Sequence, residues 1–396
     1  MFNSKEKWFF IFLLVVLAGA GVSHIGKHFI DYPVYESAAL KVLRGDLNNL
    51  YDVNRNSPGG YYYPYFFALM VTPFAAMGTL SGKIAFFVLF FGCYLYLLRF
   101  SLKVANNFVL IPNPYIFLSI IVLLSTYSFN DALMNANIGL LLLALCVFAF
   151  ELGEKKCLFW QSLVLAVAVT LKIYPIIVVF YYAWKRDWKV FGLTLVLAAF
   201  LMLGLPVVLY GYGAGSELVY KQYFVLSHFG NHWPYDSHVF QNIPSTAMRW
   251  TELFGLNKAK AFQPSLIISG LVVLMYYGIS FLKQERGDFQ CFTNRMFVLT
   301  LSLVPLIVPV SWYNMGLFYL PLLGCVVAKA VIKKDRLSII SLFAYVLFYC
   351  LCTPDIVGRP VNYWLAYRGF PFFGVLMLVL AFSVETKRLY PSKFHF

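Results

Sequence analysis

The sequence has 396 residues, of which 61% are hydrophobic and 12% are charged. Its mean hydropathy is +0.74, more apolar surface than the interior of a soluble fold can cover, which excludes a soluble enzyme, a disordered chain and a nucleic-acid-binding domain. The net charge of +14 is interpreted by position, because Lys and Arg mark the cytoplasmic loops of membrane proteins.

Apolar runs of helical length recur along the chain and predict an all-α polytopic membrane protein. The first run is interpreted as an uncleaved helix rather than a signal peptide, because its apolar stretch is at the upper limit for a signal peptide. Either interpretation places the next segment outside. The expected helices are 8–23, 62–79, 84–101, 114–129, 137–151, 158–171, 173–184, 190–210, 265–282, 296–310, 313–331, 337–352 and 364–384.

Lys and Arg gather in the connectors between these runs, which the positive-inside rule places in the cytoplasm. If 62–79 crossed the membrane, Arg99 and Lys103 would lie outside. We therefore predict that 62–79 is an interfacial helix, because its aromatic start, Tyr61-Tyr62-Tyr63-Pro64-Tyr65, suits a membrane surface. About twelve spanning helices remain.

The runs 158–171 and 173–184 form either one long helix or a hairpin of two short helices. Basic clusters flank the pair at both ends, and one long helix would put one cluster outside, so the hairpin is favoured. Its outward apex is Leu171-Lys172-Ile173-Tyr174-Pro175, where the proline ends helical hydrogen bonding.

Two long segments, 24–83 and 211–263, are extracytoplasmic in this topology, and we expect them to carry interfacial helices and most of the polar chemistry. The chain shows no linker, low-complexity tract or internal repeat, so 1–396 is predicted to be one integral membrane domain. The seven cysteines lie in apolar runs or in segments expected in the membrane or cytoplasm, and they predict no disulfides.

Two acids at the outer face are candidates for chemistry. Asp31 lies a few residues beyond the first helix among aromatic residues, and its alternative interpretation is a helix N-cap before Pro33. Asp131 lies in a polar cluster with Asn135 and Asn137, which is costly at membrane depth unless these groups bind each other, water or a ligand. A helix-capping turn explains this cluster equally well.

Lys172 is a cation at the apex of a membrane-embedded hairpin, where it needs an anionic partner or water. A lipid phosphate would serve. A salt bridge to Asp31 or Asp131 is the structural alternative.

The second outer segment contains His228, His232, His238, Gln241, Asn242 and Arg249. No carboxylate pattern accompanies the histidines, so binding of phosphate or sugar hydroxyls is favoured over zinc. Arg249 is the preferred phosphate candidate because it shares this large segment. Further along, Trp312 is either an interfacial anchor or a platform for a sugar ring.

Motifs for ATP hydrolysis, dinucleotide binding, metalloprotease and serine-hydrolase chemistry are absent from the sequence. Four other motifs follow one another in the chain. They are Asp31-x-x-Val34-Tyr35-x-x-Ala38-Ala39, Tyr62-Tyr63-Pro64-x-x-x-Ala68-Leu69-x-x-x-Pro73, Asn135-x-Asn137-x-x-Leu140-Leu141 and Leu171-Lys172-x-Tyr174-Pro175. Their order, spacing and sidedness resemble the GT-C superfamily of polyprenyl-phosphate-sugar glycosyltransferases, most closely glycosyltransferase family 87, which includes phosphatidylinositol-mannoside mannosyltransferases.

The resemblance implies a GT-C-like bundle that transfers a sugar, with mannose favoured, from a polyprenyl phosphate donor to a lipid or glycan acceptor, with inversion. It implies a multi-pass protein of the cell membrane whose active site faces outward, with Asp31 as general base. Membrane lipids are the expected surroundings, and no nucleic acid partner is expected. A lipid-linked-sugar flippase or another transporter is the alternative, which the scarcity of charges within the spans disfavours.

The candidates for binding the donor phosphate are Lys172, Arg249 and His232. The candidates for binding sugar or acceptor are Tyr35, Tyr63, Asp131, Asn135, Asn137, His238, Gln241, Asn242, Trp312 and Asn314.

Two departures from the family pattern leave donor and acceptor identity open. Gln241-Asn242-Ile243 stands where members often have Asn-Gln-Ser, and Ser311-Trp312-Tyr313-Asn314 stands where they often have Ser-Trp-x-His. His232 or His238 would supply the missing imidazole. A metal-binding Asp-x-Asp is absent at Asp31, which favours a metal-independent reaction without a cofactor.

Overall fold

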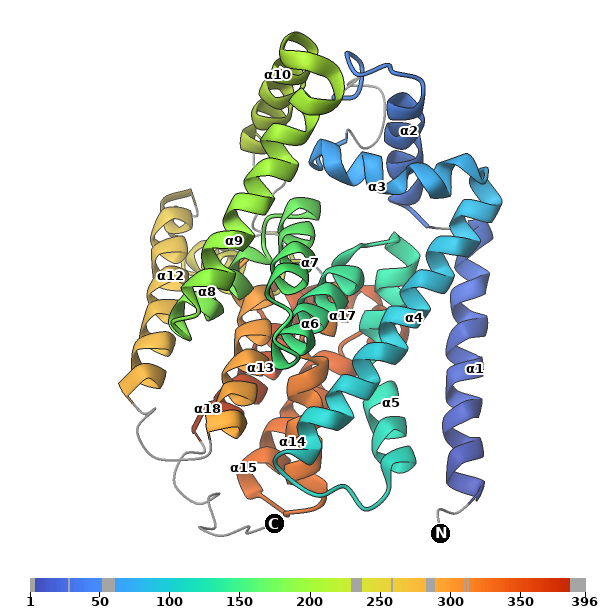
Figure 1. The fold of residues 1–396 in the computed structure, drawn as a ribbon. Coiled ribbons are helices and arrows are strands. Elements are labelled where there is room, and N and C mark those ends of the chain that lie inside the picture. Colours follow the sequence, from blue (N-terminus) through green and yellow to red (C-terminus); the bar gives the residue numbers. More distant parts are fainter. Residues whose placement is uncertain are drawn as a thin grey trace. The chain divides into compact units, whose positions relative to one another are not determined.

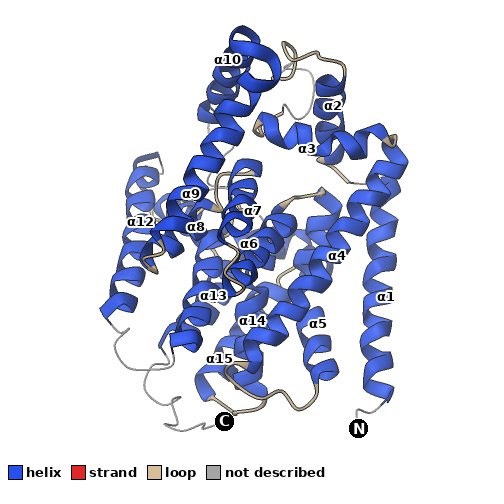
Figure 2. Ribbon diagram, in the orientation of Figure 1, coloured by secondary structure: helices blue, strands red, loops and turns tan. Residues whose placement is uncertain are grey.

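Every regular element in the described part of the chain is a helix, with no strand (Figure 2). The all-α prediction is therefore confirmed. The structure is a computed structural model, and it describes residues 4–27, 29–51, 61–228, 237–257, 259–282, 289–308, 311 and 313–384.

The chain divides into two compact units. The first unit comprises Met1–Leu17, Tyr96–Phe129 and Tyr235–Phe396, and the second comprises Ala18–Leu95 and Asn130–Pro234. Three of the four unit boundaries fall within long helices, α1 (Ser4–Lys27), α4 (Thr79–Asn106) and α5 (Pro114–Asn135).

The second unit holds the first outer segment and the predicted hairpin. Its α2 and α3 pack side by side (Figure 1), and a proline helps to start each, Pro33 within the first turn of α2 and Pro64 at the N-cap of α3. The elements wholly within this unit are α2 (Tyr32–Leu43), α3 (Tyr65–Ala76), α6 (Gly139–Glu154), α7 (Leu158–Leu171), α8 (Ile176–Trp184), α9 (Trp188–Ala199), the π-helix η1 (Phe200–Gly204) and α10 (Leu205–His228).

The first unit is built mainly from residues 235–396, in which α15 (Arg336–Tyr345) packs against both α14 (Leu320–Val331) and α18 (Phe370–Val384). Its elements are α11 (Ile243–Leu253), α12 (Ala259–Leu282), α13 (Phe289–Ile307), the 3-10 helix η3 (Tyr313–Tyr319), α14 (Leu320–Val331), α15 (Arg336–Tyr345), the π-helix η4 (Val346–Cys350), α16 (Pro354–Val357), α17 (Arg359–Tyr367) and α18 (Phe370–Val384).

Five helices of the described chain are long and apolar enough to cross a membrane, and a bent pair, Arg359–Tyr367 with Phe370–Ser383, makes a sixth if it counts as one span. These helices support a multi-pass membrane protein. The expected count of about twelve is not confirmed, because several predicted runs form shorter apolar helices. The five are Ser4–Gly26, Thr79–Asn106, Pro114–Asn135, Trp188–Ser227 and Tyr313–Val331.

The break predicted from Pro175 is present, because the chain leaves the helical conformation between α7 and α8. The run 190–210 does not end at the predicted residue, because α10 continues to His228, with a kink where Gly211 has a φ of 77°. The predicted interfacial helix is α3, which has 12 residues and is therefore about 18 Å long, short of the ~30 Å hydrocarbon core. Its position at the interface stays a prediction.

Gly82 near the start of α4 permits the close approach that brings α2, α3 and α4 together. A Cβ atom at this position would overlap the Tyr32 hydroxyl oxygen and lie 2.5 Å from the Phe74 carbonyl oxygen. The Phe86 ring, one turn along α4, packs edge-on against the rings of both Tyr32 and Phe74. This packing supports the start of α2, next to Asp31.

Candidate active site

The segment that carries Asp31 is attached to the end of α5. After α1 the chain passes through Phe29, whose φ of 62° is uncommon for a residue other than glycine. The backbone N–H groups of Ile30 and Asp31 then donate to the carbonyls of Met134 and Asn135, both at 3.1 Å. Since left-handed non-glycine residues concentrate at functional sites, the conformation at Phe29 agrees with a site next to it.

The Asp31 carboxylate does not cap a helix. Asp31 occupies the N-cap position of α2, but its side chain makes no capping hydrogen bond. Instead its Oδ2 accepts a hydrogen bond from the Tyr35 hydroxyl at 3.3 Å, and the Tyr35 and Tyr63 hydroxyls lie 3.1 Å apart. The capping alternative for the Asp31 side chain is thus wrong, while its catalytic role stays a prediction.

Lys172 lies in the extended break after α7, at the apex of the predicted hairpin. Its Nζ is 5.5 Å from the centroid of the Tyr63 ring and 5.5 Å from that of Tyr174, within range of cation–π attraction. It forms no ion pair within 4.0 Å among the described residues, so neither salt bridge considered for it is present. Asp31 is nevertheless close enough for its charge to act on Lys172.

The two charged groups have shifted proton affinities. Burial raises the pKa of Asp31, while the Lys172 ammonium and the hydrogen bond from Tyr35 act in the opposite direction. Burial lowers the pKa of Lys172 to about 8, against the influence of the Asp31 carboxylate. Asp31 is therefore a stronger base than an exposed aspartate, beside a cation that loses its proton only slightly above neutral pH.

The polar cluster at the end of α5 is largely bonded to itself. Asn135 Nδ2 donates to the backbone oxygen of Asp131 at 2.9 Å and to its Oδ1 at 3.1 Å. Asn137 Oδ1 accepts from the backbone N–H of Gly139 at 2.9 Å. These are the bonds of a helix-capping turn, so the capping alternative is supported for this cluster. Sugar binding by Asp131, Asn135 and Asn137 stays a prediction.

Gln222 in α10 is a site-supporting residue that the sequence analysis did not select. Its side chain is buried, and its Oε1 accepts from the Tyr65 backbone N–H at 2.8 Å and from the Tyr51 hydroxyl at 3.4 Å. The Tyr51 hydroxyl also donates to the carbonyl of Tyr63 at 3.2 Å. Gln222 therefore holds the backbone on which Tyr63 stands. Its one sequence signal is an amide in an aromatic stretch, which does not identify its distant partners.

Arg249 in α11 is fully buried, and all three of its nitrogens donate to protein acceptors. Nε donates to the carbonyl of Tyr367, Nη1 to the carbonyls of Ser237 and Phe240, each at 2.8 Å, and Nη2 to the Thr246 hydroxyl at 3.1 Å. This geometry gives Arg249 a structural role in joining α11 to α17. A donor-phosphate role for Arg249 stays a prediction, and it would require exchange of these bonds.

Two other candidates lie near Arg249 in the sequence, Asn242 at the start of α11 and His238 before it. Asn242 caps α11 by accepting from the Ser245 N–H at 2.8 Å, which accounts for its buried oxygen. The His238 ring lies 4.6 Å from the Tyr363 ring, and burial together with the Arg249 charge lowers the pKa of His238.

Two amides in the same unit have buried atoms without a partner in the described chain. Gln241 Nε2 donates to the carbonyls of His238 and Ala366, but its Oε1 has no partner. Asn314 is 2% exposed, and neither of its amide atoms is hydrogen-bonded. Buried polar atoms are nearly always satisfied, so these three atoms are candidate contacts for a ligand or water.

The candidates fall into two groups. The second unit holds Asp31, Tyr35, Tyr63, Asp131, Asn135, Asn137 and Lys172, while the first unit holds His238, Gln241, Asn242, Arg249 and Asn314. His232 and Trp312 lie outside the described residues. Across the described part of the chain no three His, Cys, Asp or Glu side chains gather as a metal site would require, and the expectation of a metal-independent reaction remains to be tested.

The chain matches the family model for glycosyltransferase family 87 over residues 61–354. The match includes Tyr63, Lys172 and Asn314, and it starts after Asp31. Neither the curated proteins nor the solved structures gave a match. Because the family match covers most of a chain with several membrane-spanning helices, the protein belongs to glycosyltransferase family 87 and is a multi-pass membrane glycosyltransferase.

Proposed function

We propose that the protein is an inverting glycosyltransferase that moves a mannose-like sugar from a polyprenyl phosphate to a lipid or glycan acceptor at the extracytoplasmic face of the cell membrane. The observation that supports this proposal is the closeness of Asp31 and Lys172 within one unit. A basic carboxylate hydrogen-bonded to Tyr35 lies close to an ammonium group that makes no ion pair with a described residue. Sugar transfer from a phosphodiester requires a base and a cation of this kind.

In the proposed reaction Asp31 removes the proton of an acceptor hydroxyl as that oxygen attacks the anomeric carbon of the sugar. The new carbon–oxygen bond forms while the bond between the anomeric carbon and the phosphate oxygen breaks, so the configuration inverts. The polyprenyl phosphate leaves as a monoester with one additional negative charge. The proton stays on Asp31 until solvent or product removes it. General-base assistance of this kind contributes about 10²- to 10⁴-fold to the rate.

Lys172 stabilises the charge that develops on the leaving phosphate. Its Nζ lies over the Tyr63 ring, and this contact limits the directions from which an anion can approach the ammonium group. Tyr35 donates to Asp31 and is fully buried, so it keeps the carboxylate in one orientation. Both tyrosines thus position the acid–base pair in addition to any contact with sugar.

The first unit has its own candidates for contacts with hydroxyl groups of a sugar or an acceptor. The side-chain oxygens of Gln241 and Asn314 can each accept a hydrogen bond from a sugar hydroxyl, and the Asn314 side-chain nitrogen can donate one. Asn242 and Arg249 hold the backbone that carries Gln241. His232 and Trp312 keep their proposed roles in binding phosphate and sugar.

Transfer of labelled sugar from a panel of polyprenyl phosphate donors tests this function, using purified protein in lipid and a membrane extract as acceptor. We expect product with the wild-type protein and a loss of about 10²- to 10⁴-fold in Asp31→Asn. The matched control is Asp46→Asn, an identical change at an acid of the same outer segment that bonds only locally, to Asn49. Donor movement across the bilayer without any glycosidic product would instead support the flippase alternative.

A further inference from the structure

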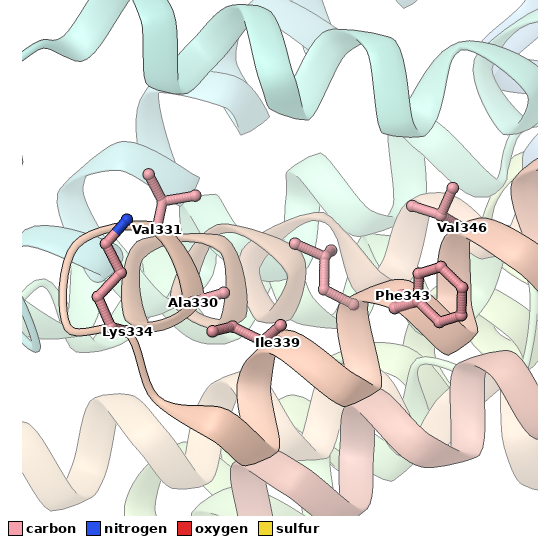
Figure 3. Close-up of a pocket in the computed structure, with 7 residues that line it drawn as sticks. Ala330, Val331, Lys334, Ile339, Phe343 and Val346 are labelled. Carbon is pink, nitrogen blue, oxygen red and sulfur yellow. The ribbon is translucent and has the colours of Figure 1, made fainter.

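A groove lies on the first unit between the end of α14 and the length of α15 and η4, with a volume of about 420 Å³. Six of its seven lining side chains are apolar and the seventh is Lys334. Figure 3 shows Lys334 at one end of the groove and Phe343 and Val346 at the other. This volume lies within the usual range for small-molecule sites.

The apolar wall is not covered by other described parts of the protein. Val331, Ile339 and Phe343 remain 45%, 44% and 67% exposed. Val331 is the last residue of α14, which belongs to a candidate membrane span. Ile339, Phe343 and Val346 recur at helical spacing, so they form one stripe about 10 Å long. A hydrocarbon chain matches the polarity of this stripe.

The charged end lies in a basic connector. Lys334 follows α14 and has no hydrogen-bond or ion-pair partner among the described residues, while Lys333 and Arg336 add two further cations nearby in the sequence. The carboxylate in this connector, Asp335, accepts from the Ser338 N–H at 2.8 Å and thereby caps α15. The connector therefore contains three cations and one carboxylate that is already engaged, and the positive-inside rule predicts that it lies in the cytoplasm.

We propose that this groove binds an anionic glycerophospholipid of the cytoplasmic leaflet, with the acidic headgroup at Lys334 and one acyl chain along α15. An acyl chain alone would fill the stripe equally well for neutral and anionic lipids. The position of Lys334 at the end of the stripe adds a preference for a negative headgroup, as basic residues do at the cytoplasmic surface of membrane proteins. One lysine near the surface corresponds to about a fivefold preference.

Quenching of an introduced tryptophan tests the site. Phe343→Trp places a fluorophore in the groove, and the protein is reconstituted with brominated phosphatidylglycerol or brominated phosphatidylcholine at equal mole fraction. After subtraction of the quenching seen in wild-type protein, we expect about fivefold tighter association of the anionic lipid. Adding Lys334→Gln removes this preference, whereas the control Lys155→Gln, an exposed lysine of another basic connector, leaves it unchanged.

Equal quenching by the two lipids, or a preference that persists in Lys334→Gln, would overturn the proposal. If Phe343→Trp does not fold, native mass spectrometry of the wild-type protein and of Lys334→Gln gives the same comparison through the lipids that each retains. If a second copy of the protein fills the groove in place of a lipid, quenching will depend on the density of protein in the membrane, and this result would also overturn the proposal. The readout is lipid binding alone, so it is independent of the proposed transferase reaction.

Discussion

The pH dependence of transfer provides a direct test of the roles proposed for Asp31 and Lys172. Asp31 must be ionised to accept a proton, so activity should rise with pH through its pKa, which burial raises above 3.8. Lys172 must be protonated to stabilise the leaving phosphate, so activity should fall as the pH rises through its pKa of about 8. The expected profile of kcat/KM is a bell whose alkaline limb belongs to Lys172.

Lys172→Arg is the informative change, because a guanidinium group keeps its charge over the whole range. One pH unit above its pKa, Lys172 is about one-tenth protonated, so wild-type activity at about pH 9 should lie roughly tenfold below its plateau. In Lys172→Arg the alkaline limb should disappear, even if the plateau is lower. Neither a phosphodiester nor a sugar hydroxyl titrates over this range, so the limb reports on the protein.

The assay is transfer by purified protein in lipid at constant ionic strength across the pH range. Lys155→Arg is the matched control, since it makes the same replacement at an exposed lysine and should preserve the wild-type profile. An alkaline limb that stays near pH 8 in Lys172→Arg would refute the assignment of this limb to Lys172, and with it the proposed role in stabilising the leaving group.

Three further changes test other parts of the structure. Gln222→Leu leaves the buried Tyr65 N–H without its acceptor, while the Tyr51 hydroxyl keeps the Tyr63 carbonyl. We therefore expect a stability loss of about 1–3 kcal/mol in chemical denaturation and a lower kcat, and an unchanged kcat would argue against support of Tyr63. Gly82→Ala should lower the thermal unfolding midpoint by several degrees, because the new methyl group meets the Tyr32 hydroxyl and a carbonyl of α3; an unaltered midpoint would contradict this close approach. Arg249→Lys should lower stability and leave the KM for donor unchanged, whereas a large increase in that KM would favour the phosphate role instead.

Much of the helical architecture follows from local sequence. The run 158–171 coincides with α7, and the break predicted at Lys172 and Pro175 is present because proline cannot continue the hydrogen bonding of a helix. The ends of other helices differ from the apolar runs. α4 extends to Asn106, beyond the predicted 101, because polar residues at the end of a span still form helical bonds. The number of spans was harder to predict, since short apolar helices and true spans have the same composition.

The candidate site was predictable in part. Asp31, Tyr35, Tyr63 and Lys172 were selected from motifs and the family resemblance, and contacts link them within one unit. Gln222 was missed because a single amide has no periodic or motif signal. Arg249 was chosen as a phosphate ligand because it shares the second outer segment, yet it is fully buried with its donors engaged, which no feature of its neighbours in sequence indicates.

The sequence by itself determined that the protein is helical, that it is a membrane protein, and where its α7–α8 break lies, because each depends on apolar content or on bonds between near neighbours. Only the tertiary structure decided that Asp31 turns away from capping α2 and accepts from Tyr35, and that the Lys172 ammonium lies over Tyr63. The contact of Lys172 with Tyr63 joins residues that are far apart in the chain. The contact of Asp31 with Tyr35 competes with helix capping by the same carboxylate, so the local sequence does not predict which of the two forms.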